Sequence, residues 1–222
     1  MIEIAVLDLA GTTICDNGLV MAAFASALQS VGCDTNQPEG QAALEYASQT
    51  MGSSKISVFT AIFEHDVQRA NQANSAFEQA YAARLELAQP IAGAAQTIEL
   101  LRQRGIKVAL TTGFSPQTRQ ALLAAVGWQS LADLCLSPAD AGRGRPLPDL
   151  ALTALLRLGG NSVNGLLVAG DTAADMQCGR NAGAGAVVGV LTGAHNAAQL
   201  VSAGASHIVD SIAELPELVA SL

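Results

Sequence analysis

Acidic and hydroxyl side chains follow apolar runs that are typical of buried strands. Asp8 ends the run IEIAVLD, Thr111 and Thr112 end IKVALTT, and Asp171 ends GLLVAGD, with Asp175 one helical turn later. Carboxylates that converge with small hydroxyls and backbone amides form a site for a hard cation, and open positions for phosphate oxygens suit magnesium. The sequence therefore predicts Mg²⁺ as a cofactor beside a phosphoryl-binding site.

A basic loop adds to this set. The segment GRGRPLPD contributes Arg143 or Arg145 from a loop that precedes a helix. Taken singly, each residue also fits a structural role, with Asp8 in a turn, Asp171 at a helix cap and the arginine at the surface. Their occurrence together at successive strand ends favours a shared chemical site over separate structural roles.

The elements that position these residues follow an alternating pattern. Short β-branched or aliphatic runs are each followed by a loop and then a helical pattern, which is the order that produces a parallel sheet. The runs are IEIAVLD, IKVALTT, ADLCL, GLLVAGD, AVVGVLT and SHIVD. In open sheets of this class the ligand crevice lies at the carboxyl ends of the strands. We predict an α/β fold with a doubly wound parallel sheet.

A purely helical stretch interrupts the alternation after the first strand. Residues 1–8 form that strand, whereas the next strand of this type begins only at Ile106. Helical spacing occurs over residues 19–31, 38–50, 53–64 and 66–88, with Gly32, Pro38 and Gly52 as breaks. We predict that residues 1–15 and 90–222 form an α/β catalytic core. Residues 16–89 are predicted as an α-helical cap inserted into it.

Composition and charge argue against several classes of protein. The chain has 222 residues, of which 50% are hydrophobic and 14% charged, so it can bury a sizeable core. Its formal net charge of −8 and its scattered basic residues argue against a nucleic-acid partner. The four cysteines lack CxxC spacing, which argues against zinc and favours a reducing cytoplasm. We expect neither a signal peptide nor a membrane span.

The motifs now assembled resemble those of the haloacid dehalogenase superfamily of phosphohydrolases. Its nucleophilic aspartate opens a DxxxT loop and a later GDxxxD loop completes the metal site; DLAGT and GDTAAD match both. Within the superfamily the chain is most similar to the phosphonatase (phosphonoacetaldehyde hydrolase) group. That resemblance covers nearly the whole chain, including DLAGTT, MGSSK, LTTGF, GRPLPD and GDTAADMQCGRNAG.

The resemblance implies a role for each metal-site residue. Asp8 would be the nucleophile and a metal ligand, the backbone carbonyl of Ala10 a second ligand, and Asp171 a third. Asp175 would orient the shell of the metal.

The resemblance also implies that Thr112 and Arg145 hold the phosphoryl oxygens. The amides of Gly11 and Thr12 are further candidates for binding the phosphoryl group, as is Gly113.

Ala10 points to the kind of bond that is cleaved. Ordinary phosphatases of this superfamily place a second aspartate two residues after the nucleophile, where it protonates the leaving alkoxide. Without it, hydrolysis of an ester would lose about 10²- to 10⁴-fold in rate. A phosphonate aldehyde has a carbon leaving group instead, which an amine can stabilise by forming an imine. The sequence thus favours a carbonyl phosphonate.

Lys55 is the candidate amine, because the chain contains only one other lysine, Lys107, which is most simply a surface residue. Ser53 or Ser54 is expected to cap the next helix and to leave Lys55 in its first turn, where the helix dipole disfavours the ammonium form. The apolar neighbours Met51, Ile56, Val58 and Phe59 would add desolvation. The structural alternative is a solvated lysine at a helix end.

Two positions depart from the phosphonatase pattern. That group has a histidine three residues after its imine-forming lysine, where this chain has Val58, and the nearest histidine of the insert is His65. It also tends to have a tyrosine after TTG, where this chain has Phe114. Arg145 agrees with the group. The identity of the substrate therefore stays open.

The leading hypothesis is a Mg²⁺-dependent phosphonatase-like hydrolase that acts on a small phosphonate or phosphorylated metabolite through an aspartyl-phosphate. One alternative is a phosphomonoesterase for a small metabolite, made slow by Ala10. Another is a non-catalytic module that binds a phospho-ligand, for which an inserted cap has no evident use. No nucleic-acid or membrane partner is expected, and the resemblance is compatible with a homodimer.

Overall fold

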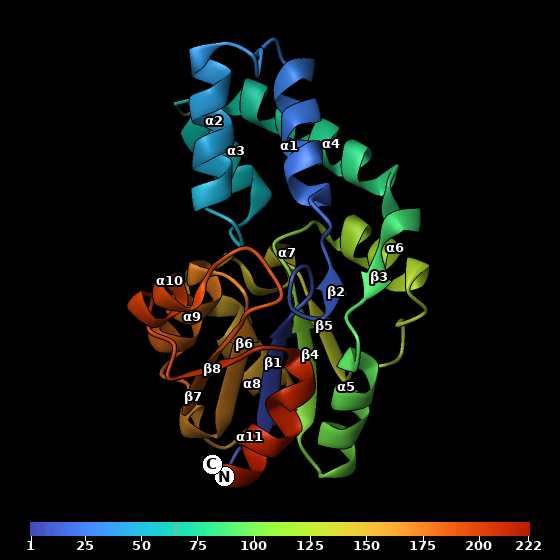
Figure 1. Cartoon of the computed structure of the whole chain (residues 1–222), viewed down its shortest axis with the longest axis vertical. Coiled ribbons are helices and arrows are strands. Elements are labelled where there is room, and N and C mark those ends of the chain that lie inside the picture. Colours follow the sequence, from blue (N-terminus) through green and yellow to red (C-terminus); the bar gives the residue numbers. More distant parts are fainter. Residues whose placement is uncertain (65) are drawn as a thin grey trace.

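The centre of the computed structural model, which describes residues 1–64 and 66–222, is a six-stranded parallel sheet (Figure 1). Its strand order is β5-β4-β1-β6-β7-β8. The strands are β1 (Ile4–Asp8), β4 (Lys107–Thr111), β5 (Leu134–Leu136), β6 (Leu166–Gly170), β7 (Ala186–Val190) and β8 (His207–Val209). The predicted doubly wound sheet is confirmed, and every expected run contributes a strand.

Both faces of the sheet are buried, as expected for strands covered by helices on each side. Along β1, Ala5 and Leu7 belong to one apolar cluster, whereas Ile4 and Val6 belong to another on the opposite face. Register is fixed at the carboxyl end of the strand, where Asp8 lies opposite Thr111 of β4. The strand ends therefore bring their polar side chains to one edge.

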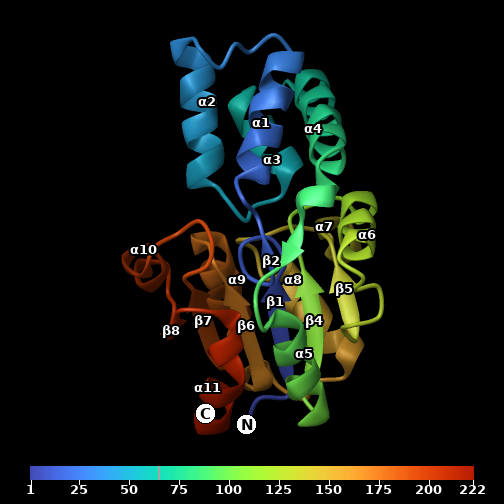
Figure 2. The same cartoon turned by 45° about the vertical axis from the view of Figure 1, so that its right-hand side comes forward.

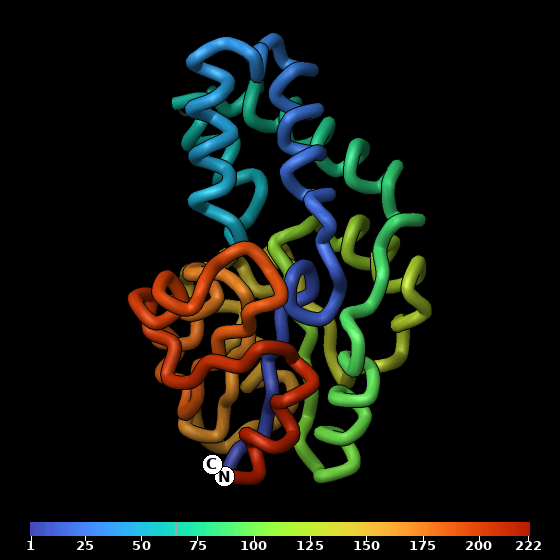
Figure 3. The backbone as a smooth tube through the Cα atoms, viewed as in Figure 1, coloured from blue at the N-terminus to red at the C-terminus, as the bar shows by residue number. Residues whose placement is uncertain are grey.

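Helices of the α/β part cover the two faces and alternate with the strands (Figure 3). They are α5 (Ala94–Gln103), α6 (Pro116–Ala125), α7 (Pro138–Ala141), α8 (Asp149–Leu158), α9 (Ala173–Ala182), α10 (Ala197–Ser202) and α11 (Leu215–Ser221). Helices α5 and α11 pack against one face, and α8 and α9 against the other. Within the described ranges, no helix has the length and apolar character required to cross a bilayer.

The segment between the first two sheet strands is helical, and we call residues 16–89 the helical insert. It contains α1 (Leu19–Ser30), α2 (Pro38–Gln49), α3 (Lys55–Ile62) and α4 (Val67–Ala82). The chain leaves through β2 (Ile14–Cys15) and returns through β3 (Gln89–Pro90), which pair antiparallel. The four helices stand beyond the carboxyl ends of β1 and β4 (Figure 2).

The helix expected over residues 66–88 is shorter than predicted. Helix α4 ends at Ala82, and a short 3₁₀ helix follows at Leu85–Leu87. The guanidinium of Arg84 turns back to donate a hydrogen bond to the carbonyl of Ala80, which satisfies an acceptor in the last turn. His65 lies outside the described residues.

Candidate active site

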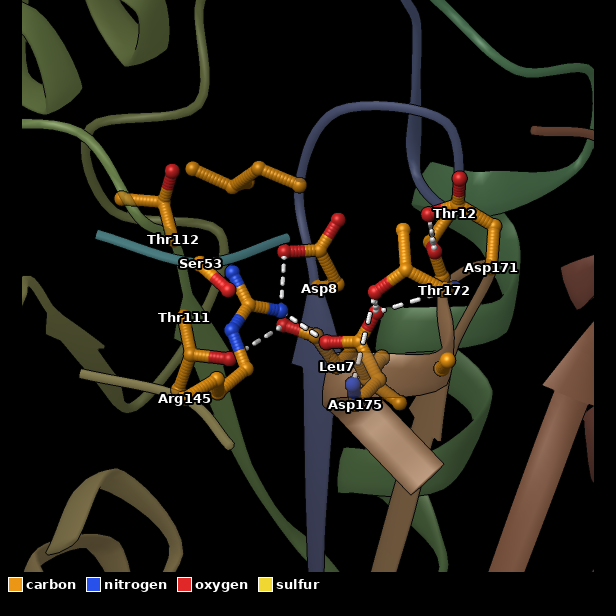
Figure 4. Close-up of polar contacts among 12 residues, drawn as sticks. Leu7, Asp8, Thr12, Ser53, Thr111, Thr112, Arg145, Asp171, Thr172 and Asp175 are labelled. Atoms are coloured by element: carbon orange, nitrogen blue, oxygen red, sulfur yellow. Dashed lines mark hydrogen bonds and ion pairs between the residues drawn. The ribbon is translucent and has the colours of Figure 1, made fainter. Parts of the chain in front are cut away.

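A buried arginine joins two of the predicted carboxylates (Figure 4). Asp8 ends β1, Asp175 lies in the first turn of α9, and Arg145 comes from the loop between α7 and α8. Nη1 of Arg145 is 2.6 Å from Oδ1 of Asp8 and also donates to Oδ1 of Asp175. Nε of Arg145 is buried and has no hydrogen-bond partner within the described residues. An unpaired donor in a buried position is costly to the folded state.

The structure selects between the two arginines of GRGRPLPD. Arg143 is largely exposed and forms a bidentate pair with Asp149, with Nε 2.8 Å from Oδ1. Only Arg145 turns inward to the strand ends. It meets carboxylates there, whereas the sequence suggested that it binds phosphoryl oxygens.

Asp171 is held in place from two sides. Oγ1 of Thr12 donates to Oδ1 of Asp171 at 2.9 Å, and the amide of Ala194 donates to Oδ2 at 2.8 Å. Gly11 has a φ of +96°, and a Cβ at this position would lie 2.6 Å from Cγ of Asp171. A side chain at position 11 would therefore displace this carboxylate.

The amides of Gly11 and Thr12 do not form the expected phosphoryl cradle. The Gly11 amide donates to the carbonyl of Ile14 at 2.8 Å, and the Thr12 amide donates to the carbonyl of Leu9 at 3.4 Å. Both donors are used to close the turn after β1. The structural contribution of this turn is instead the Thr12 hydroxyl and the close approach of Gly11 to Asp171.

Three carboxylates lie close enough to share a cation. One oxygen from each of Asp8, Asp171 and Asp175 lies within 4.8 Å of the other two. Burial raises the pKa of Asp8, with Asp175 adding to the rise and Arg145 opposing it. Burial followed by the charge of Asp175 likewise raises the pKa of Asp171. An oxygen-rich, electron-rich cluster of this kind fits Mg²⁺.

A cavity of about 420 Å³ opens above these strand ends. Of the predicted site residues, it is lined by Asp8, Ala10, Gly11, Lys55, Thr112, Gly113, Arg145 and Asp171. Thr12 and Asp175 do not line it, and each supports a residue that does. Val20, Met21, Met51 and Phe114 give the cavity an apolar side. The structure thus gathers carboxylates, one guanidinium and one amine around one space.

The residues at the carboxyl end of β4 form local hydrogen bonds and also allow close contact with the helical insert. Oγ1 of Thr112 accepts a hydrogen bond from the amide of Phe114 at 3.2 Å, and Oγ1 of Thr111 donates to the carbonyl of Leu7 at 3.4 Å. A Cβ at Gly113 would lie 2.5 Å from the carbonyl oxygen of Ser53. Gly113 therefore lets the helical insert approach β4 closely.

Lys55 is the first residue of α3, as predicted, but its surroundings differ from those expected. It is only 5% exposed, so the alternative of a solvated lysine is wrong. Ser54 occupies the N-cap position without a capping side-chain hydrogen bond, so the predicted serine cap is wrong. The ammonium faces the rings of Phe24, Phe77 and Phe114. Burial, followed by the charge of Arg145, lowers the pKa of Lys55 to about 8.

Sequence reasoning missed three groups beside this amine. Phe24 of α1 and Phe77 of α4 are fully buried, and nothing in their spacing linked them to Lys55. Asp16 lines the cavity, and its carboxylate accepts hydrogen bonds from the amides of Gly18 and Val20. An aspartate two residues before a glycine, with an apolar helix following, is a signal of this capping role.

Residues 2–183 match the model of a protein family described as "haloacid dehalogenase-like hydrolase". The chain belongs to this family. It is a hydrolase, and its parallel sheet and strand-end carboxylates are those that the sequence motifs indicated.

Curated relatives of this chain carry the name phosphonoacetaldehyde hydrolase. The protein of Bacillus cereus is 36% identical over 107 residues, which are 48% of this chain and 40% of that protein. This chain thus aligns with less than half of the length of that relative. The protein of Bacteroides fragilis is 28% identical across 98% of this chain and 95% of its own length.

A solved structure shows the same fold. A phosphonoacetaldehyde hydrolase-like protein from Oleispira antarctica superposes with a TM-score of 0.84 at 24% identity. The superposition covers 99% of this chain and 92% of the other.

Proposed function

We propose that this chain is a Mg²⁺-dependent, phosphonatase-like hydrolase that cleaves the carbon–phosphorus bond of a small carbonyl phosphonate. The observation that carries the proposal is the shared cavity, in which an amine of lowered pKa, Lys55, and the buried carboxylate of Asp8 line one space of about 420 Å³. Such a space takes one small molecule, whose two ends these groups can reach together. Its expected partner is a small phosphonate or phosphorylated molecule, and a homodimer stays compatible with the resemblance.

Lys55 supplies the means of breaking a bond to carbon. Its neutral amine adds to the substrate carbonyl, water leaves, and the nitrogen becomes a protonated imine. The pair of electrons in the carbon–phosphorus bond then moves toward this imine and yields an enamine. Ala10 provides no proton to a leaving oxygen, and this route needs none.

Asp8 receives the phosphoryl group as a carboxylate oxygen forms a bond to phosphorus. Arg145 lies 2.6 Å from Asp8 and is positioned to neutralise charge that gathers on the phosphoryl oxygens. Water then hydrolyses the aspartyl-phosphate to inorganic phosphate. The enamine takes up a proton, and its hydrolysis frees the carbonyl product and Lys55.

The carboxylates of Asp8, Asp171 and Asp175, with the carbonyl of Ala10, would hold the magnesium ion. When bound, the ion supplies positive charge that offsets repulsion between the carboxylates and the incoming phosphonate. Thr12 and the amide of Ala194 keep Asp171 in its orientation throughout.

Phosphate release from a substrate panel tests the proposal. Phosphonoacetaldehyde with Mg²⁺ is expected to release phosphate at least about 10²-fold faster than p-nitrophenyl phosphate, since an ester gains nothing from Lys55 and lacks a general acid at Ala10. Faster release from the ester would favour the phosphomonoesterase. Release from neither, together with Mg²⁺-dependent binding of phosphate, would favour a binding module.

Replacement of Asp171 is expected to weaken the use of magnesium. Asp171→Asn keeps the size of the side chain and an acceptor for Thr12 but removes a charged ligand, so the Mg²⁺ concentration for half-maximal activity should rise at least about tenfold. Thermal stabilisation by Mg²⁺ alone should shift to higher concentration in parallel. Asp149→Asn, which alters only a surface ion pair, is the matched control. Unchanged Mg²⁺ titrations in Asp171→Asn would remove Asp171 from the metal site.

A further inference from the structure

Three phenylalanine rings surround the amine of Lys55. Nζ lies 5.5 Å from the ring centroid of Phe114, 5.6 Å from that of Phe24 and 5.9 Å from that of Phe77. These distances fall within the range in which the face of an aromatic ring attracts a cation. The rings come from α1, α4 and the loop after β4, so both the helical insert and the sheet contribute. We call these three residues the phenylalanine cage.

The phenylalanine cage takes the place of a carboxylate as the neighbour of the Lys55 ammonium group. No carboxylate oxygen of the described residues lies within 4.0 Å of Lys55 Nζ. Within the described part of the chain, the amine donates one hydrogen bond, to the backbone carbonyl of Ser53 at 3.5 Å. Asp8, Asp16 and Glu78 act on the amine only from a greater distance, and Arg145 opposes them. A positive charge on this nitrogen therefore depends on the rings for local stabilisation.

We propose that the phenylalanine cage serves as the counter-ion substitute for the protonated imine formed at Lys55, an inference that rests on the proposed function. The step that creates the charge balances as follows. Nζ bonds to the carbonyl carbon, and the carbonyl oxygen leaves as water with one proton from the nitrogen and one from solvent. The nitrogen keeps one proton and a positive charge. This charge disappears when the carbon–phosphorus bond breaks and the neutral enamine forms.

An aromatic cage suits an anionic substrate better than a carboxylate would. A carboxylate beside Nζ would hold the lysine as an ion pair and would repel the phosphonate, since like charges in a buried space are costly. Ring faces attract the cation through their quadrupoles and add no net charge. The cage thus supports the cationic intermediate and leaves the negative charge of the site to Asp8 and its neighbours.

The cage is rigid because its rings pack on one another. The centroids of Phe24 and Phe77 are 4.8 Å apart, and those of Phe77 and Phe114 are 6.2 Å apart. Tyr81 packs against Phe114 with the two rings tilted by 35° and their centroids 4.4 Å apart. Phe114 also lines the cavity, so it contacts the space in which the substrate carbonyl must lie. It is the member of the cage most suited to substitution.

The test reduces the attraction of the Phe114 ring face for a cation while it keeps the shape of the ring nearly unchanged. Replacement by 4-fluoro-, 3,5-difluoro- and 3,4,5-trifluorophenylalanine withdraws electrons in steps. Borohydride trapping with phosphonoacetaldehyde should give less adduct at Lys55 with each added fluorine, down by about threefold to tenfold for the trifluoro form. Phe114→Leu should trap as little as the trifluoro form. The same series at Phe63, which faces Arg69 and not Lys55, is the control and should leave trapping unchanged.

A second readout separates this inference from the proposed function. Reductive ¹³C-methylation labels the lysines, and with Lys107→Arg the remaining lysine signal belongs to Lys55. Its titration, followed by NMR without substrate, should move to lower pH as fluorine is added. A shift without any trapped imine would show that the rings stabilise the lysine cation, but it would overturn both the proposed role of the cage at the imine and the imine chemistry. Trapping and titration that are both independent of fluorine would overturn the cage and leave the proposed function standing.

Discussion

Asp8→Asn is expected to give a folded protein whose phosphate release from phosphonoacetaldehyde is lower by at least about 10⁴-fold. The asparagine amide has nearly the size of the carboxylate, but its oxygen is too weak a nucleophile to take the phosphoryl group. Arg145 keeps its partner Asp175 in the variant, so the buried guanidinium is not left without a counter-charge. Circular dichroism and phosphate release measured on the same sample check both halves of this expectation.

Two further measurements define the role of Asp8. Acid quench of the wild type during turnover, followed by peptide mass analysis, should find phosphate on Asp8 and on no other residue. Asp149→Asn, the same change at a surface ion pair, should keep wild-type activity. If Asp8→Asn released phosphate from any substrate at a rate close to that of the wild type, Asp8 would not be the nucleophile.

The sequence was most informative where sheet geometry decides the outcome. Strands that run parallel must end at one edge, so Asp8, Thr112 and Asp171 could be placed together from their positions after apolar runs. The same pattern predicted the helical insert, because the next strand of the parallel type after β1 does not occur until β4. These predictions required only periodicity and chain order.

Contacts between distant segments could not be predicted in this way. The sequence placed Lys55 in the first turn of α3, but whether the side chain faces water or Phe24 and Phe77 depends on how α1, α3 and α4 pack. The hydrogen-bond partners of backbone amides in a turn likewise could not be predicted from the sequence. The amide of Gly11 is free or engaged according to backbone angles that the motif DLAGTT does not determine.

Lys55 is the residue whose replacement should separate the two kinds of hydrolase most clearly. Lys55→Arg keeps a positive charge but cannot form the imine, so borohydride should trap no adduct and phosphate release from phosphonoacetaldehyde should fall by about 10³-fold or more. In the wild type, trapping should increase as pH rises through about 8, because the neutral amine is the form that attacks the carbonyl. Peptide mapping should locate the adduct at Lys55, with Lys107 unmodified.

The stability of a neutral variant gives an independent check on the same residue. Burial lowers the pKa of Lys55 from 10.5 to about 8, which corresponds to a cost of the order of 3 kcal/mol for the charged folded state. The unfolded chain binds this proton more tightly than the folded chain does. Lys55 therefore destabilises the fold most below about pH 8, and this destabilisation decreases as pH rises toward 10.5. Lys55→Met, similar in shape and uncharged, should therefore unfold at a higher temperature than the wild type at pH 7.

The advantage of Lys55→Met should shrink as pH rises from about 8 to 10.5, where the wild-type lysine loses its proton in both states. Thermal unfolding of both proteins across this range measures the change. A variant that is more stable at pH 7 yet inactive would show that the fold tolerates this buried amine at a cost because the reaction requires it. The opposite outcome would be that borohydride traps no adduct in the wild type and that Lys55→Arg still hydrolyses phosphate esters. These results would identify a phosphomonoesterase, in which Lys55 has no part in bond cleavage.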